Sequence, residues 1–130
     1  MSIALWCLFA AGVLHFASKL PLIYAQTQES GGYDNRNPRA QQAALQGWGE
    51  RALAVHKNQM ESFPLFAAGI LVALFTDAAP SAVDYLALAY ILARLAYLYF
   101  YLTNAATVRS LVWLVGLISS LALLCSPIWG

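Results

Sequence analysis

Ionisable and amide side chains interrupt the second apolar stretch of the sequence, between residues 50 and 75. On a helix, at about 100° per residue, three of them share one face with Ala54: Arg51, Asn58 and Glu61. Glu61 lies about three turns into this helix, beside the apolar run 63–75, where a carboxylate needs a cation or several hydrogen-bond donors. Arg51, an arginine of another helix or the ammonium group of a ligand could meet that need.

Two explanations of this polar face stay open. An interfacial first turn, whose charges extend to water, explains Glu50 and Lys57 at the edge of the face. It does not explain Asn58 and Glu61, for which we favour a function, direct or through the architecture of a site, because polar groups inside spanning helices are costly. His56 points almost the opposite way, and a hydrogen bond between helices is the preferred explanation for it.

A second polar stripe follows the helix expected over residues 82–102. Its members are spaced four, three, four and three residues apart, which places them on one helical face: Tyr90, Arg94, Tyr97, Tyr101 and Asn104. Phenols around one guanidinium offer hydrogen-bond donors to an anion and flat surfaces to an apolar group. The structural alternative is a polar seam between helices in which Arg94 pairs with Glu61, and this pairing does not exclude a site nearby. Tyr85 and Tyr99 lie outside the stripe and are expected to face lipid or the membrane interface.

Arg109 and Ser110 stand at the expected start of the fourth span. They could complete an anion pocket, because the N-terminus of a helix also attracts negative charge. An exposed interfacial arginine is the alternative. In the first span we interpret Lys19 as an anchor that snorkels to the membrane surface, and we assign no proton-transfer role to His15.

The two cysteines, Cys7 and Cys125, both lie in apolar runs without metal-ligand spacing. We therefore expect two small buried hydrophobic side chains and no metal site. A disulfide between them stays open, because both fall near the same membrane face in the topology given below.

Membrane-spanning helices must position these residues, since 61% of the residues are hydrophobic and 10% are charged, against roughly a quarter charged in soluble domains. The sequence predicts an all-α integral membrane four-helix bundle that forms a single domain over residues 1–130. A span needs about 20 apolar residues, and the expected spans are residues 2–25, 50–75, 82–102 and 110–129. The net charge of +1 argues against a nucleic-acid partner.

The first span is expected to be a retained helix, because the apolar run 1–17 has no basic leader of the kind that precedes a cleaved signal. We expect it to be helical through Lys19 and less regular past Pro21. In the polar connection 26–47, Asn37 and Pro38 are typical of an N-cap and first turn, here of a short helix through Leu45.

Basic residues set the expected orientation of the spans. Neither terminus carries a basic side chain. The basic residues lie in or beside the first and third connections: Lys19, Arg36, Arg39, Arg51, Lys57 and Arg109. The positive-inside rule therefore predicts that these two connections are cytoplasmic and that both termini lie on the other side.

The order of residues in the second span resembles a known family. The segment 50–66, ERALAVHKNQMESFPLF, is similar to the second-helix motif of the MAPEG family, the membrane-associated proteins of eicosanoid and glutathione metabolism. The likeness extends over nearly the whole chain and includes Arg94 followed by Tyr97 and Tyr101. Residues 108–110 also resemble the start of the fourth helix in prostaglandin E synthases of this family.

This resemblance implies a homotrimer that binds glutathione between neighbouring subunits near the cytoplasmic face. By position, Asn58 and Glu61 would hold the glutathione backbone, and the two family tyrosines would line the pocket. Arg109 would stabilise the thiolate. Many members carry arginine where this chain has Ala54, for which Arg51 is the nearest substitute, and some carry tyrosine in place of Ser62.

Two functions are weighed on these grounds. The first is a membrane-bound, glutathione-dependent transferase or peroxidase that acts on small lipophilic electrophiles arriving through the bilayer. The second is a non-catalytic membrane protein or a small exporter that uses Glu61 as its intramembrane carboxylate. The arginines Arg94 and Arg109 argue against export of cations, because they would repel them.

Overall fold

The computed structural model describes all residues 1–130 and consists of helices without strands. The helices are α1 Ile3–Ala17, α2 Lys19–Thr27, α3 Pro38–Ala44, α4 Trp48–Phe75, α5 Pro80–Leu102, α6 Ala106–Leu124 and α7 Ser126–Trp129. Four stretches are long and apolar enough to cross a membrane: α1 together with α2, then α4, α5 and α6. The predicted all-α bundle of four spans is confirmed.

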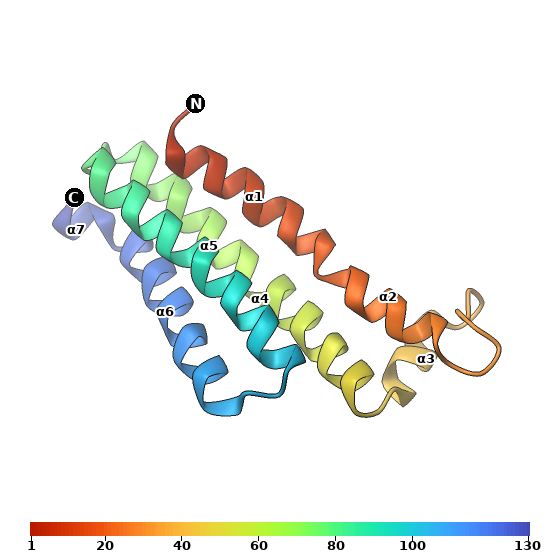
Figure 1. Cartoon of the computed structure of the whole chain (residues 1–130). Helices are drawn as coiled ribbons and strands as arrows, with labels where there is room; N and C mark the ends of the chain where they lie inside the picture. Colours follow the sequence, from red (N-terminus) through yellow and green to blue (C-terminus); the bar gives the residue numbers. More distant parts are fainter.

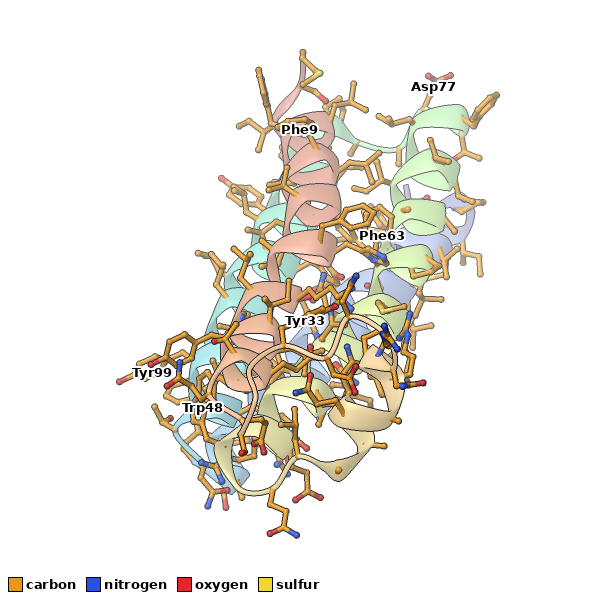
Figure 2. All side chains as sticks on the ribbon, turned by 90° about the vertical axis from the view of Figure 1, so that its right-hand side faces the viewer. Phe9, Tyr33, Trp48, Phe63, Asp77 and Tyr99 are labelled. Atoms are coloured by element: carbon orange, nitrogen blue, oxygen red, sulfur yellow. The ribbon has the colours of Figure 1, made fainter.

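The two middle spans form the centre of the bundle. Helix α1 packs against α4 and α5 from one side and α6 packs against them from the other, with no contact between α1 and α6 (Figure 1). Both termini and the α4–α5 turn lie at one end, whereas α3 and the α5–α6 turn lie at the other (Figure 1). Figure 2 shows the two ends from another side, with Phe9 and Asp77 toward one and Trp48 and Tyr99 toward the other.

The first span is helical further than expected, because α2 continues through Thr27. It is interrupted at Ser18, four residues after Leu14, whose carbonyl accepts the Ser18 N–H at 2.9 Å. Pro21 explains this position, since a proline ring clashes with the carbonyl four residues earlier, here that of Ala17.

The fourth span differs from the expected 110–129 at both ends. It begins at Ala106, because Asn104 adopts a left-handed conformation (φ 61°) that ends α5 within a short turn. It ends at Leu124, and Ser126–Trp129 form the separate helix α7. The Pro127 ring would clash with the Leu123 carbonyl if α6 continued.

Helices α4 and α6 pack closely against each other at Gly69. A Cβ at Gly69 would lie 2.8 Å from the Cβ of Leu123 and 3.0 Å from the carbonyl oxygen of Ser120, so only glycine allows α4 and α6 to approach this closely.

Only 30 of 130 residues are buried, which leaves the outer faces of the bundle to lipid or to another subunit. Tyr85 and Tyr99 are 73% and 62% exposed, which agrees with the lipid-facing positions predicted for them.

Glutamine side chains hold the first connection against the bundle. The Gln41 amide donates to the Gly32 carbonyl at 2.9 Å and accepts from the Asp34 N–H at 3.0 Å and from the Gln26 amide at 3.1 Å. The short helix predicted after Asn37 is confirmed as α3, but the Asn37 side chain forms no capping bond. The connection is therefore ordered by side chains that bond to its backbone.

The two cysteines differ in burial. Cys7 is buried, as expected, whereas Cys125 is exposed, and both are free thiols. The expectation of burial is wrong for Cys125 because α6 ends one residue before it, so that it lies at the break between α6 and α7.

Candidate functional site

Arg94 lies at the centre of the polar residues that the sequence singles out. It is 2% exposed, and its Nε donates to Gln59 Oε1 at 2.7 Å while its Nη2 donates to Asn58 Oδ1 at 2.8 Å. The guanidinium carbon also lies 4.3 Å from the centre of the Tyr97 ring, within the range of a cation–π contact. All of these partners are uncharged.

The expected ion pair between Arg94 and Glu61 is therefore wrong. The two amides of α4 occupy the donors of Arg94 that face them, and Glu61 is an exposed residue. A buried cation without a carboxylate partner is energetically costly. An anion bound beside this charge would lower that cost.

A pocket opens beside this arginine between α4, α5 and α6. It has a volume of about 200 Å³ and joins polar residues to apolar ones. Its lining residues are Asn58, Glu61, Ser62, Leu65, Arg94, Trp113, Leu117 and Ser120. Since Glu61 and Arg94 face the same pocket without bonding to each other, it offers both signs of charge to a ligand.

A second pocket lies closer to the α5–α6 turn and has a volume of about 220 Å³. Its lining residues are Tyr97, Tyr101, Arg109, Ser110 and Trp113. The Arg109 guanidinium carbon lies 4.5 Å from the centre of the Tyr101 ring, and the rings of Tyr97 and Tyr101 meet edge to face at 5.5 Å. Trp113 lines both pockets, so they are adjacent parts of one groove.

The structure thus brings together seven of the eight residues predicted for a site. Only Arg51 lies apart, because it lines neither pocket and its Nε is buried without a hydrogen-bond partner. It is seven residues before Asn58 on α4, which puts it about two turns away along the helix. The suggestion that Arg51 serves in place of an arginine at Ala54 gains no support from its position in this chain.

Tyr90, the first member of the predicted stripe, packs in the core and does not line either pocket. It is fully buried, its ring stacks on Phe66 at 3.8 Å between centres, and its hydroxyl lies 2.9 Å from Ser62 Oγ. Asn104, the last member, sits in the α5–α6 turn and is exposed. The members of the stripe that line the pockets are therefore the middle three, Arg94, Tyr97 and Tyr101.

His56 faces away from the pocket, as predicted from the helical angle. Its Nδ1 lies 3.0 Å from the hydroxyl of Ser18, at the interruption between α1 and α2. The predicted hydrogen bond between helices is confirmed, and it ties the broken first span to α4.

Five residues of the site were not singled out from the sequence. Two come from α4, Gln59, which follows Asn58 directly, and Leu65, and the other three come from α6: Trp113, Leu117 and Ser120. The α6 residues share one helical face at spacings of four and three, a pattern that also describes ordinary packing. Only an expected polar partner for that face could have distinguished the two.

An all-α membrane bundle with a polar groove between three of its spans is the class of protein that this fold and site define. The model of the MAPEG family matches residues 3–129. Because this match covers nearly the whole chain, the chain belongs to the MAPEG family. A search of curated proteins found no match, and neither did a search of solved structures.

Proposed function

We propose that the protein is a membrane-bound, glutathione-dependent transferase or peroxidase that acts on small lipophilic electrophiles. The observation that carries this proposal is the buried guanidinium of Arg94, which has only neutral partners and faces an open pocket. The family to which the chain belongs supports a role in glutathione metabolism. The groove supplies a place for that substrate.

The charges along the groove complement those of glutathione. Two cations, Arg94 and Arg109, and one anion, Glu61, line the two pockets. Glutathione carries two carboxylates, one ammonium group and, when its thiol is ionised, a thiolate, so Glu61 complements the ammonium group and the two arginines complement two of the three negative charges. Asn58 adds a hydrogen-bonding amide to the same wall.

Arg109 is the residue we propose to stabilise the thiolate. A free cysteine thiol has a pKa of about 8.5, and a nearby fixed cation lowers the pKa of a thiol and raises its thiolate fraction. The Tyr101 ring lies against the Arg109 guanidinium, within the range of a cation–π contact. Ser110, the next residue on α6, contributes a hydroxyl to the same pocket.

With a chloronitrobenzene as electrophile, the thiolate sulfur forms a bond to the ring carbon and chloride leaves. The thiol proton passes to solvent. In the peroxidase reaction, one glutathione thiolate attacks a hydroperoxide oxygen and an alcohol leaves; a second glutathione then yields the disulfide and water. Leu65 and Leu117 give the groove an apolar wall suited to substrates that reach it from the bilayer.

We further propose that the working unit is a homotrimer. Glu61 and Trp113, which line the groove, are exposed in the single chain. A neighbouring subunit placed over the groove would exclude water from the thiolate.

Glutathione binding by calorimetry tests the proposal, with the protein purified in detergent or in lipid discs. The wild type should bind glutathione, give thiolate absorbance and conjugate the chloronitrobenzene, whereas Asn58→Ala and Arg109→Ala should each lose affinity or thiolate signal. Arg39→Ala is the matched control, because Arg39 is an exposed arginine on α3 outside both pockets. Absence of a thiolate signal at millimolar glutathione would overturn the enzymatic proposal and favour a non-catalytic membrane protein.

A further inference from the structure

Arg94 determines which atom of the Asn58 amide faces the pocket. Arginine has only hydrogen-bond donors, so the atom of Asn58 that lies 2.8 Å from Arg94 Nη2 is the oxygen. The other amide atom, Nδ2 with its two N–H groups, is then the one left for a ligand. Asn58 lines the pocket and therefore offers it a donor.

Gln59 determines in turn how Arg94 is oriented. Its Oε1 accepts from Arg94 Nε at 2.7 Å, and both residues are 2% exposed. Arg94 donates from Nε and Nη2, the two nitrogens of one edge of the guanidinium, and the Tyr97 ring covers one of its faces at 4.3 Å. Three contacts thus fix the plane of the group. Gln59 itself does not line either pocket.

We infer that Gln59 is a positioning residue which acts through Arg94 to make Asn58 a donor, so that the ligand atom bound by Asn58 is a carbonyl or carboxylate oxygen. This inference rests on the proposed function, because glutathione is the ligand considered. The polarity matters for specificity. A site built around a donor rejects a ligand that presents an ammonium group there, since two donors would face each other without an acceptor.

The variant Asn58→Asp tests the direction of the amide. Aspartate retains an oxygen for Arg94 but replaces the two N–H donors with a second acceptor that carries negative charge. We expect glutathione affinity, measured by calorimetry, to fall at least tenfold. Affinity equal to or higher than that of the wild type would show that an oxygen faces the ligand and would overturn the inference.

The variant Gln59→Met tests the positioning role. Methionine has a similar length but offers no comparable acceptor to Arg94 Nε, so we expect the KM for glutathione to rise about fivefold to tenfold with little change in kcat. The matched control is Gln42→Met, because Gln42 is also buried and hydrogen-bonded, to Gln26 Oε1, but lies outside both pockets. An unchanged KM in Gln59→Met, or an equal rise in Gln42→Met, would overturn the positioning role.

A measurement without glutathione separates this inference from the proposed function. The Arg94 Nε–H proton should give a resolved NMR signal that exchanges slowly with water in the wild type, because it is buried and hydrogen-bonded to Gln59. The signal should be retained in Gln59→Glu, which keeps the acceptor, and lost in Gln59→Met. If the wild type fails to bind glutathione but shows this pattern, the function is wrong and the arrangement of Gln59 and Arg94 stands; equal exchange in the two variants overturns that arrangement.

Discussion

Arg109 differs from Arg94 in what holds it in place. Two amide oxygens fix Arg94, whereas Arg109 packs on the face of the Tyr101 ring. A guanidinium held by an aromatic face can keep that contact while its donors turn toward a developing anion. This freedom suits a residue that meets the thiolate only when substrate is present.

Replacement of Arg109 should therefore separate charge from shape. In Arg109→Ala we expect kcat at saturating glutathione to fall about a hundredfold or more, the usual effect of removing one preorganised donor from a reacting anion. In Arg109→Lys we expect a fall of about tenfold, because lysine keeps the charge but loses the flat contact with Tyr101. Equal activity of the lysine and alanine variants would contradict a role for the charge.

The helical face of Arg94 could be predicted from the sequence, but its hydrogen-bond partners could not. Helical spacing placed Arg94, Tyr97 and Tyr101 on one face, and the structure confirms this grouping. It could not choose between Glu61 and the amides as partners of Arg94. A long side chain reaches across two neighbouring helical faces, so the choice depends on how α4 and α5 are rotated, which is set by packing such as the Tyr90–Phe66 stack.

Among the helices, the contact of α4 with α6 sets the width of the groove. Gly69 lies directly against Leu123 and the Ser120 carbonyl, and Ser120 also lines the pocket. Ser120 therefore lies where the close contact between α4 and α6 meets the pocket.

We expect Gly69→Ala to lower stability by about 1–3 kcal/mol, the usual effect of overpacking a close contact. The added Cβ would meet backbone and Cβ atoms that cannot rotate away, at 2.8–3.0 Å. Gly12→Ala is the matched control, since its Cβ would meet only the tip of the Phe63 ring at 3.9 Å. Thermal unfolding in the same detergent measures both, and an equal effect of the two substitutions would contradict the steric explanation.

Helix ends were predicted less well than helix positions. The apolar runs indicated all four spans because spanning length and composition are properties of a whole segment. The ends of α6 depend on single residues instead: the left-handed Asn104 and the ring of Pro127. In the first span, the interruption by Pro21 fell at Ser18, but the helix resumed at once because the third helical position needs no intrahelical N–H donor.

For the whole molecule, the orientation in the membrane stays a prediction. Both termini lie at one end of the bundle and the first and third connections at the other (Figure 1), which is the grouping that the positive-inside rule requires. The basic residues of α3 and its flanking loop would then face the cytoplasm.

Single-cysteine labelling measures this orientation. In a chain whose Cys7 and Cys125 are replaced by alanine and serine, Asp77→Cys should react with a membrane-impermeant maleimide on intact cells. Ser30→Cys should react only after the cells are opened, because it lies in the first connection; both native residues are exposed. The reverse pattern would show that the protein is inserted with the opposite orientation.

Trp113 makes the groove optically observable. Its indole lines both pockets and is 39% exposed, whereas the other three tryptophans, Trp6, Trp48 and Trp129, line neither. Indole emission depends on the polarity and charge around the ring, so glutathione should change the emission of Trp113 as it displaces water from the groove. Trp113→Phe should abolish this change, and a retained change would place the ligand elsewhere. The chain thus carries its own fluorescent reporter of occupancy, and titrations can follow the site without a dye attached to the protein.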